Sequence, residues 1–377
     1  MDLDHDACYQ AVCARDARFD GRFFTAVKTT GIYCRPVCPA RTPQSANVVF
    51  YPTAAAAQEA GFRPCLRCRP EAVPDLRPLP GKTEVLAGSH PEVELLLPYL
   101  QPYDWPDMLE FLRRRAIPGI ERVTADQYVR SVQFNGAQGT VAVRVADRNA
   151  LCATLRFPDP SVLPVVIARL RRVFDLATDP IVIAGHLAKD PVLAALVQAR
   201  PGLRVPGAWD GFELAIRAVL GQQITVAAAV RLAGRLVAAY GPRMVQPDGD
   251  LIHVFPEPEV LASADLASLG MPRSRAAALS AVAAAAMADT HLFDASRGLD
   301  DAIRRLCLIR GVGEWTAQYI ALRQMREPDA FPASDIVLLR SIAKLEGRDY
   351  SPSQLIARAQ TWRPWRAYAA QHLWVCA

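Results

Sequence analysis

The sequence has no long apolar run, since every stretch of about 18 residues, the length a membrane-spanning helix needs, contains a charged side chain. No secretory signal is evident, because the start, MDLDHDACYQ, is acidic and has no apolar segment. Its histidines show no metal-binding spacing, and its 9 cysteines, an odd number, do not indicate a disulfide framework. We therefore expect a cytoplasmic protein without a membrane segment.

Four of the cysteines form two close pairs near the start of the chain. Cys34 and Cys38 lie in CRPVC, and Cys65 and Cys68 lie in CLRC. Two such pairs are typical of tetrahedral Zn²⁺ sites, because each short hairpin brings two thiolates to one side of the ion. Residues 21–70 hold seven Lys or Arg residues and one acidic residue. A zinc-bound, basic module indicates nucleic-acid binding.

Three further regions follow along the chain. Proline and glycine are frequent in residues 73–92, which predicts a linker. In residues 127–157, apolar residues alternate with others on both sides of the Asn135-Gly136 pair, which predicts an antiparallel meander. From Ser161 onward, apolar residues recur at spacings of three and four, which predicts helices. The predicted fold class is therefore multidomain α+β.

A second strong motif is LxxIRGVGxxTA, in residues 306–317. Gly311 and Gly313 allow a turn between two helices that is too tight for side chains. Backbone N–H groups at the start of the second helix can then bind a DNA phosphate. A plain helix-capping turn is the alternative for Gly-Val-Gly alone, but the complete pattern is much more specific.

These residues carry a resemblance to a known family. LIRGVGEWTAQYIALR, followed by Asp335 in FPASDIVLL, resembles the helix-hairpin-helix glycosylase superfamily, and more narrowly the AlkA-type 3-methyladenine DNA glycosylases II. The resemblance covers residues 98–375 and includes the segments PYDWPDMLEFLRRRAIPGIERV, RPGLRVPGAWDGFELAIRAVLGQQIT, LGMPRSRAAAL and WRPWRAYAAQHLW. It implies hydrolytic removal of alkylated bases from double-stranded DNA.

The resemblance assigns a role to four residues. Asp335 matches the catalytic aspartate, which would stabilise the oxocarbenium-like sugar and position or deprotonate water. Trp315, Tyr319 and Trp374 match the aromatic pocket for the flipped base, where an N-methylated, cationic purine attracts electron-rich rings. The alternatives are a helix N-cap for Asp335 and a core stripe at i, i+4 for Trp315 and Tyr319.

Other positions refine this expectation. Relatives that cleave the DNA strand carry Lys where this sequence has Trp315, so the resemblance implies a monofunctional N-glycosylase. The segment GQQIT matches the loop that fills the gap left by the flipped base, and the plug is Gln222, Gln223 or Ile224. A monovalent cation bound by backbone carbonyls of residues 308–313 is a further candidate ligand.

The first module resembles a second family. FTAVKTTGIYCRPVCPARTPQSANVVFYPTAAAAQEAGFRPCLRCRPE resembles the Ada-type zinc domain that repairs methyl phosphotriesters. The resemblance implies that Cys34, as a zinc thiolate, accepts a methyl group from the DNA backbone. It also implies phosphate contacts by arginines, among them Arg35, Arg63 and Arg67. A purely structural zinc ribbon is the alternative.

The two resemblances divide the chain into four parts. They are an Ada-type zinc domain (1–72), the Pro-rich linker (73–92), an AlkA N-terminal α+β domain with a TBP-like sheet (93–205) and the helix-hairpin-helix glycosylase domain (206–377). The helix-turn-helix module that normally follows an Ada-type zinc domain is not evident. We therefore expect a monomeric enzyme that repairs alkylated DNA. The alternative is a methylation-sensing regulator with a non-catalytic glycosylase scaffold.

Overall fold

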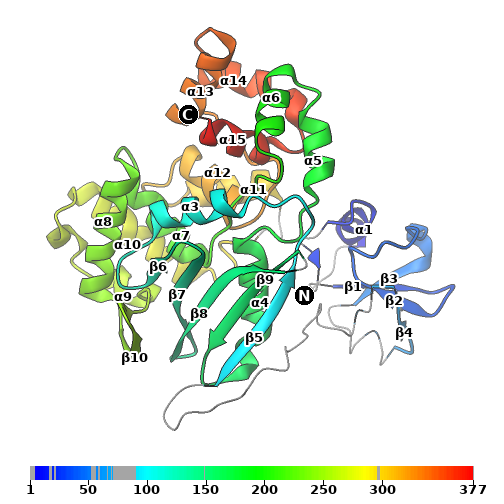
Figure 1. The fold of residues 1–377 in the computed structure, drawn as a ribbon, viewed down its shortest axis with the longest axis horizontal. Helices are drawn as coiled ribbons and strands as arrows, with labels where there is room; N and C mark the ends of the chain where they lie inside the picture. Colours follow the sequence, from blue (N-terminus) through cyan, green and yellow to red (C-terminus); the bar gives the residue numbers. More distant parts are fainter. Residues whose placement is uncertain are drawn as a thin grey trace. The chain divides into compact units, whose positions relative to one another are not determined.

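The structure, a computed structural model, describes residues 5–16, 19–20, 23–51, 57, 60–65, 67–68, 70, 91–147, 149–294 and 298–376. The chain divides into two compact units, Met1–Arg77 and Pro78–Ala377. The predicted linker is residues 73–92, and its residues 73–90 lie outside the described residues, whereas residue 92 already begins a strand. In the described part of the chain, no helix combines the length and the apolar character that crossing a bilayer requires. The fold class is mixed α+β, as predicted (Figure 1).

The first unit contains a small four-stranded sheet and the helix α1 (His5–Cys13). The strand order is β3-β1-β2-β4, with β1 antiparallel to β2 and β3 and with β2 parallel to β4. The strands are β1 (Phe24–Val27), β2 (Ile32–Cys34), β3 (Val48–Tyr51) and β4 (Arg63–Pro64), and a 3-10 turn, η2 (Ser45–Asn47), precedes β3. Aromatic side chains such as Phe23 and Tyr33 fill the small core. The parallel pair β2–β4 places the residues that follow both strands at one edge.

The second unit begins with a five-stranded antiparallel sheet in the order β5-β9-β8-β7-β6. Asn135 and Gly136 join β7 to β8 with φ angles of 50° and 80°. Two consecutive positive φ values are those of a type I′ turn, which matches the twist of a hairpin. The predicted meander is therefore confirmed, with strands at β5 (Glu92–Pro98), β6 (Glu121–Val123), β7 (Gln127–Phe134), β8 (Ala137–Ala146) and β9 (Ala150–Arg156).

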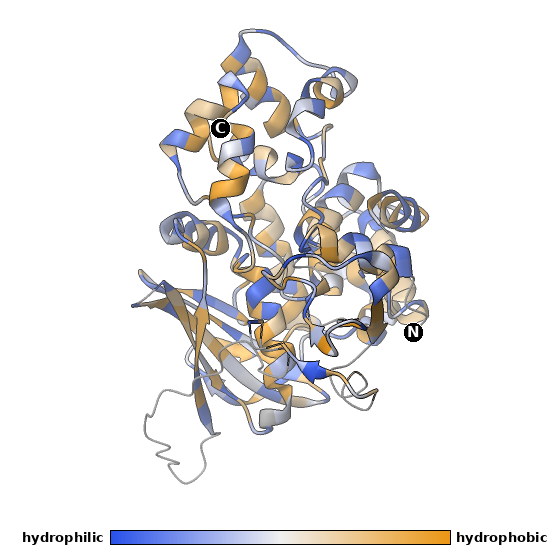
Figure 2. Ribbon diagram, turned by 90° about the vertical axis from the view of Figure 1, so that its right-hand side faces the viewer, coloured by the Kyte–Doolittle hydropathy of each residue, from blue (hydrophilic) through white to orange (hydrophobic). Residues whose placement is uncertain are grey.

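Helices make up most of the remaining chain, and they bury their apolar faces in one large core (Figure 2). A short hairpin, β10 (Arg243–Asp248) and β11 (Leu251–His253), interrupts them and was not expected from the sequence. The helices are α3 (Trp105–Arg115), α4 (Leu163–Val173), α5 (Pro180–Leu187), α6 (Pro191–Ala199), α7 (Gly211–Leu220), α8 (Val226–Tyr240), α9 (Pro258–Ser263), α10 (Arg273–Ala288), α11 (Leu299–Cys307), α12 (Glu314–Arg323), α13 (Ile336–Glu346), α14 (Pro352–Arg358) and α15 (Arg366–Val375), with 3-10 turns η3 (Pro160–Val162), η4 (Leu266–Leu269) and η5 (Ala359–Trp362).

The helices of the second unit form two groups (Figure 1). In one group, α10 packs against α7 and α9, α7 also packs against α8 and α12, and α11 packs against α12. In the other group, α6 packs against α5 and α15, and α15 packs against α13. Helix α6 therefore contacts an element far along the chain. Helix α12 lies between the two groups, and the first turns of α12 and α13 come to the same region.

A buried network of charges joins the sheet to the helices. Arg130 on β7 binds Glu213 on α7 at 2.7 Å, and Arg217 binds both Glu213 and Glu121 at 2.6 Å. The charges of the two arginines outweigh the desolvation that burial imposes and lower the pKa of Glu213 to about 2. Removing one partner from such a network costs about 3–5 kcal/mol, because a buried charge is left alone. The network therefore fixes α7, and with it the loop after α7, against the sheet.

Candidate active site and metal centre

A cavity of about 1510 Å³ opens in the second unit. Its lining comes from α3, α7, α8, α12 and α15 and from the loops that precede α8, α12 and α13. This volume exceeds the roughly 300–1000 Å³ of a small-molecule pocket, so the cavity has room for more than one base-sized group. Asp335, Trp315, Tyr319 and Trp374 all line it. Residues from α12, α13 and α15 that lie far apart in the sequence therefore meet in one cavity.

Asp335 is the N-cap of α13 and also faces the cavity. Its Oδ1 accepts hydrogen bonds from the backbone N–H of Val337 at 2.9 Å and of Leu338 at 3.1 Å, and from Nε1 of Trp374 at 3.2 Å. Its Oδ2 accepts one hydrogen bond, from Nε1 of Trp315 at 2.8 Å. The capping role that the sequence offered as an alternative is therefore present, but it uses one oxygen and leaves the other beside the indole of Trp315.

The three aromatic side chains form one wall. The rings of Trp315 and Tyr319 are stacked with centroids 5.3 Å apart and planes 9° apart, and Tyr319 meets Trp374 edge to face at 6.4 Å. All three side chains are half-buried and line the cavity rather than being enclosed in the core. Their position is that of a wall against which a flat, apolar group could stack.

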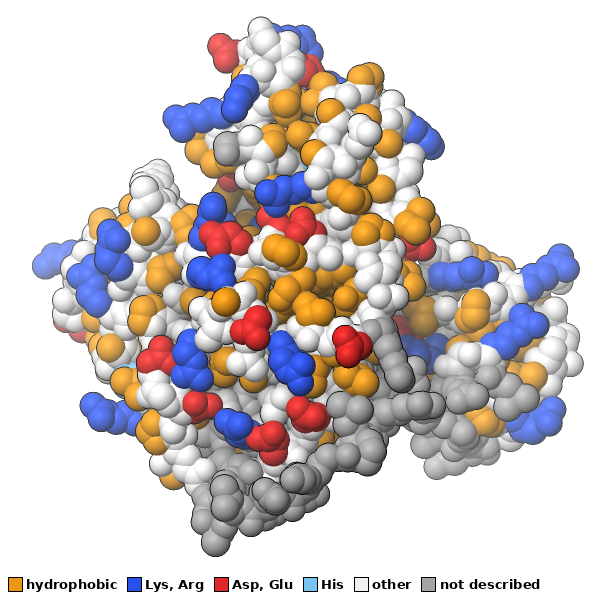
Figure 3. Space-filling model, viewed as in Figure 1, with side chains coloured by type: hydrophobic (Ala, Val, Ile, Leu, Met, Phe, Trp, Pro, Cys, Tyr) orange, Lys and Arg blue, Asp and Glu red, His pale blue; other side chains and the backbone are white. Residues whose placement is uncertain are grey.

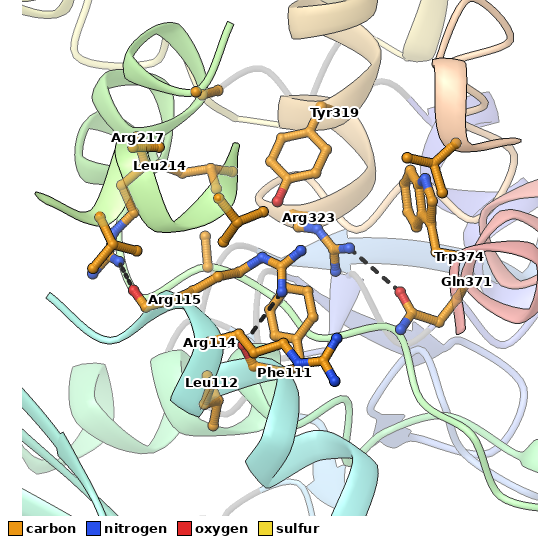
Figure 4. Close-up of a pocket in the computed structure, with 18 of the residues that line it drawn as sticks. Phe111, Leu112, Arg114, Arg115, Leu214, Arg217, Tyr319, Arg323, Gln371 and Trp374 are labelled. Carbon is orange, nitrogen blue, oxygen red and sulfur yellow. Dashed lines mark hydrogen bonds between the residues drawn. The ribbon is translucent and has the colours of Figure 1, made fainter. Parts of the chain in front are cut away.

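Two arginines stand behind this wall, and the sequence did not mark them as site residues. The guanidinium of Arg323 lies over the rings of Tyr319 and Trp374, with its carbon 5.0 and 5.2 Å from the ring centroids. Arg115 lies over Phe111 at 3.9 Å, and the Tyr319 hydroxyl points toward both arginines (Figure 4). Arg323 follows Trp315 and Tyr319 at spacings of four, so all three lie on the same helical face. This spacing is the sequence feature that could have identified Arg323 as a site residue.

The arginines change the expected chemistry of the rings. Burial alone would raise the pKa of Tyr319, but the charges of Arg323 and Arg115 outweigh it and lower that pKa. A ring face that already binds a guanidinium attracts a second cation less strongly, because the two cations repel each other. Of the three rings, Trp315 is the one over which the described residues place no guanidinium.

The hairpin between α11 and α12 contains two glycines, and they differ in backbone conformation and in the space around the Cα atom. Gly311 has a φ of +87°, and a Cβ at this position would lie 2.3 Å from the Cβ of Ala278, so both conformation and packing require glycine. Gly313, the N-cap of α12, has an ordinary φ of −92°, and a Cβ there would meet nothing within 4 Å. Neither the backbone conformation nor the packing requires glycine at position 313. A partner such as DNA that approached this backbone closely would require it. The predicted monovalent cation stays a prediction.

The three candidate plug residues lie in the loop between α7 and α8, and each has a different environment. Gln222 donates from Nε2 to the Gly311 carbonyl at 2.9 Å and to Thr316 Oγ1 at 3.0 Å, so it ties this loop to the hairpin. Ile224 packs against the large core. Gln223 is exposed and has a φ of 57°, a left-handed conformation that is uncommon for a residue with a side chain. Gln223 is therefore the candidate that projects outward.

The four paired cysteines come together in the first unit. Cys34 ends β2 and Cys65 follows β4, and the parallel pairing of these strands places them side by side. All four sulfur atoms lie within 4.8 Å of one another, and those of Cys38 and Cys65 are 3.9 Å apart. Tetrahedral zinc with Zn–S bonds of about 2.3 Å needs sulfur atoms about 3.8 Å apart, so the cluster fits the ion.

The thiols differ in their surroundings. Cys38 and Cys65 are buried, whereas Cys34 and Cys68 are half-exposed. The backbone N–H of Arg35 donates to the sulfur of Cys68 at 3.4 Å. Hydrogen bonds with Cys34 and Cys68 lower the pKa of Cys38 to about 2, and hydrogen bonds with Cys38 and Cys68 raise that of Cys34. Four crowded thiols thus compete for negative charge, and a divalent cation allows all of them to ionise.

The predicted phosphate-binding arginines of this unit fall into two classes. Arg63 and Arg67 are exposed, and the visible surface of the unit carries several Lys and Arg side chains (Figure 3). Arg35 is different, because its guanidinium forms an ion pair with Asp20 and donates from Nε to Asp20 Oδ1 at 2.6 Å. Arg35 would have to leave this partner to bind a phosphate.

Three family descriptions match successive parts of the chain. Residues 7–71 match "Metal binding domain of Ada", residues 94–210 match "AlkA N-terminal domain", and residues 216–367 match "HhH-GPD superfamily base excision DNA repair protein". Among solved structures, the 3-methyladenine DNA glycosylase from Archaeoglobus fulgidus superposes with a TM-score of 0.65 and 19% identity, over 75% of this chain and 97% of that one. This likeness shows the fold.

Curated proteins are similar over more of the sequence. The "Probable bifunctional transcriptional activator/DNA repair enzyme AlkA" of Mycobacterium tuberculosis is 33% identical, over 99% of this chain and 97% of that protein. The "DNA-3-methyladenine glycosylase 2" of Escherichia coli is 36% identical, over 72% of this chain and 94% of that protein. The Escherichia coli Ada protein is 55% identical over 69 residues, which are 18% of this chain and 20% of Ada. The chain therefore belongs to the AlkA-type family of helix-hairpin-helix base excision DNA repair proteins, joined to an Ada-type metal-binding domain.

Proposed function

We propose that this protein hydrolyses the N-glycosidic bonds of alkylated bases of the 3-methyladenine type in double-stranded DNA, and that it acts as a monomer. The observation that carries the proposal is the position of Asp335, which faces a large cavity beside three aromatic side chains. The names of the similar proteins from Escherichia coli and Mycobacterium tuberculosis support the same activity.

The hydrogen bonds of Asp335 indicate which oxygen acts. Oδ1 accepts three hydrogen bonds, which exhausts its lone pairs, whereas Oδ2 accepts one and has capacity for another. In our proposal a base leaves the DNA stack and lies against the aromatic wall, with its sugar near Asp335. The carboxylate stabilises positive charge on the sugar as the C1′–N bond breaks, and Oδ2 accepts a proton from the water that attacks C1′.

The loop and the hairpin supply the DNA contacts in this proposal. Gln223 occupies the gap left by the flipped nucleotide, and its amide can hydrogen-bond the unpaired base opposite. The N–H groups of the first turn of α12 bind a backbone phosphate, which the absent side chain at Gly313 allows to approach closely. Gln222 holds the two contact regions together through its bonds to Gly311 and Thr316. Trp315, in place of the lysine of strand-cleaving relatives, leaves the enzyme monofunctional.

We further propose that the first unit binds one zinc ion and that Cys34 accepts a methyl group from a phosphotriester. Cys34 is half-exposed, and in the described part of the unit no backbone N–H donates to its sulfur, unlike that of Cys68. Such a hydrogen bond would withdraw charge from a thiolate. The S–CH₃ bond forms as the O–CH₃ bond breaks, and the phosphodiester oxygen leaves with the electron pair. Arg63 and Arg67 are placed to contact phosphates.

Transcriptional activation is not included in this proposal. The alignment with the Mycobacterium tuberculosis protein has 481 positions, whereas this chain has 377 residues, so that protein contains residues without a counterpart here. The regulator alternative predicts tight, sequence-specific binding to a promoter after methylation and no release of base.

One experiment tests both activities. The purified protein is incubated with DNA treated with a methylating agent; released bases are identified by chromatography, and methyl groups on the protein are located by mass spectrometry. We expect free 3-methyladenine with many turnovers, and one methyl group per protein on Cys34. Absence of free base would overturn the glycosylase proposal, and absence of protein methylation would overturn the proposal for Cys34.

A further inference from the structure

One uncharged polar side chain in the wall of the cavity has a hydrogen-bond donor without an acceptor. Gln371 on α15 lines the cavity and is 2% exposed. Its Oε1 accepts a hydrogen bond from Nη2 of Arg323 at 3.3 Å. Its Nε2 has no acceptor among the described residues, and it is not enclosed, unlike the unpaired Nε of Arg323. Because a polar atom in such a place normally has a partner, the amide nitrogen is available to a group inside the cavity.

The orientation of this amide follows from its partner. A guanidinium offers only donors, so the atom of Gln371 that meets Arg323 is the oxygen. Arg323 is itself held, since its Nη1 donates to the Pro206 carbonyl at 2.7 Å and its side chain is buried. Figure 4 shows the amide oxygen turned to Arg323 and the amide nitrogen turned away from it. A positive charge at the oxygen polarises the amide, which strengthens the donor at the other end.

The free donor belongs to the surroundings of the aromatic wall. Gln371 and Trp374 are three residues apart on α15, so they lie on the same face of that helix. The guanidinium that holds Gln371 also lies over the rings of Tyr319 and Trp374, at 5.0 and 5.2 Å. A flat base that stacks on this wall presents its edge to the side chains around it, and hydrogen bonds to that edge distinguish one flipped base from another.

The chemistry of alkylated purines decides which edge group suits an N–H donor. Methylation at N3 or N7 uses the lone pair of one ring nitrogen, and the positive charge weakens the ring nitrogens that remain as acceptors. A carbonyl oxygen at position 6 keeps its lone pairs and accepts hydrogen bonds over a broad range of directions. An amino group at position 6 is itself a donor, so it cannot pair with Nε2 of Gln371. The donor therefore fits a 6-oxo purine.

We propose that Gln371 is a specificity-determining residue whose Nε2 donates to the 6-oxo group of a flipped alkylated purine, and that this contact promotes the release of bases such as 7-methylguanine. The inference rests on the proposed glycosylase activity and adds a substrate class to it. Release of 3-methyladenine, which has an amino group at position 6, does not depend on the contact. The hydrogen bond adds no step to the reaction, because it acts on binding and orientation of the base.

The test uses the complete protein and DNA treated with a methylating agent, from which 7-methylguanine, 7-methyladenine and 3-methyladenine are separated by chromatography. The two 7-methyl bases carry the same methyl group and the same charge, but one has an oxo group and the other an amino group at position 6. Release is measured under single-turnover conditions for the wild type, Gln371→Leu, Gln371→Glu and Gln318→Glu. Glutamate keeps an acceptor for Arg323 but has no N–H. Gln318 is the matched control, since its Oε1 accepts from the Phe331 N–H at 3.0 Å and it does not line the cavity.

We expect Gln371→Leu and Gln371→Glu each to lower the ratio of 7-methylguanine release to 7-methyladenine release about tenfold, a change of about 1.4 kcal/mol. Release of 3-methyladenine should persist in both variants, and Gln318→Glu should leave the ratio unchanged. An unchanged ratio in Gln371→Glu, or equal loss of all three bases, would overturn the inference and would limit Gln371 to holding Arg323. A wild-type protein that releases 3-methyladenine but no 7-methylguanine would overturn the inference alone, whereas release of no base would overturn the glycosylase proposal as well.

Discussion

The two reactive centres of this protein are built in opposite ways. The cysteine cluster draws on residues 34–68, and a single parallel pairing between β2 and β4 brings its two halves together. The Asp335 cavity draws on α3, α7, α12, α13 and α15, which are spread over more than half of the chain. A metal can organise the first centre, because ligand binding is itself folding free energy. The second depends on the packing of a large apolar core.

The two centres also differ in whether the reacting side chain is used up. In the proposed reactions, a thiolate that accepts a methyl group is consumed, which would limit the first unit to one event per molecule. A carboxylate that positions water is regenerated, which would let the second unit turn over. Since the two centres lie in separate compact units, changes in one should leave the other working.

The largest expected effect is complete loss of methyl transfer in Cys34→His. Histidine keeps a nitrogen donor for zinc but removes the nucleophilic thiolate. Methyl groups on the protein and zinc content are measured by mass spectrometry, and base release is measured beside them. Base release should equal that of the wild type. The control is Cys13→Ser, since Cys13 is an exposed cysteine of the same unit outside the cluster. Methylation that persists in Cys34→His would move the acceptor to another residue.

The next effect is on catalysis in the second unit. Asp335→Asn should lower the single-turnover rate of base release by about 10²–10⁴-fold, because the amide cannot take a proton from water. Asparagine remains a good N-cap, so α13 should be preserved. Asp179→Asn is the control, since Asp179 caps α5 in the same manner, with bonds to the N–H groups of Ile181 and Val182. Equal rates for the two variants would refute the catalytic role.

A third effect concerns stability against unfolding, which should depend on pH through His372 in the second unit but not in the first. Burial and the charge of Arg200 lower the pKa of His372 to about 4 from 6.5. Between these values the unfolded chain binds a proton that the folded state does not, so the second unit should lose stability as the pH falls from about 6.5 to about 4. The loss is at most about 3 kcal/mol.

This pH dependence is measured by urea unfolding of the wild type and of His372→Gln. The variant should lose most of the slope, whereas His291→Gln, at an exposed position, should keep it. Unfolding of the first unit should not respond to either substitution. A slope that is the same in all three proteins would show that His372 does not cause it.

The smallest effect is expected in the loop between α7 and α8. Gln223→Ala should slow base release about tenfold, the equivalent of one lost hydrogen bond of about 1.4 kcal/mol. Gln223→Leu should recover part of the rate, because an apolar side chain also fills the gap. Gln360→Ala, which alters an exposed glutamine outside the cavity, serves as control. If Gln223→Ala has the wild-type rate, another residue occupies the gap.

Much of the fold followed from local patterns. The meander around Asn135-Gly136 and the helical second half depend on residues that are close together in the sequence, so alternation and spacing were sufficient. The cysteines were predictable for another reason, since each close pair is itself typical of a zinc site. The contact of α6 with α15 was not apparent, because it joins helices that lie far apart along the chain, about which a local pattern contains no information. The hairpin β10–β11 was also missed, although its two strands are neighbours in the sequence, and in the fold it packs against β7 and β8.

The order of amino acids was enough to identify the residues that carry the proposed chemistry. The spacing of the four cysteines by itself predicted a zinc site, whereas Asp335 and the three aromatic side chains were assigned through the resemblance to the AlkA-type glycosylases. Their arrangement emerged only from packing in three dimensions. Asp335 caps a helix with one oxygen and faces Trp315 with the other, and Arg323 lies behind the aromatic wall. A side chain's charge is written in the sequence, but its electrostatic effect depends on distance and burial, which the folded chain sets.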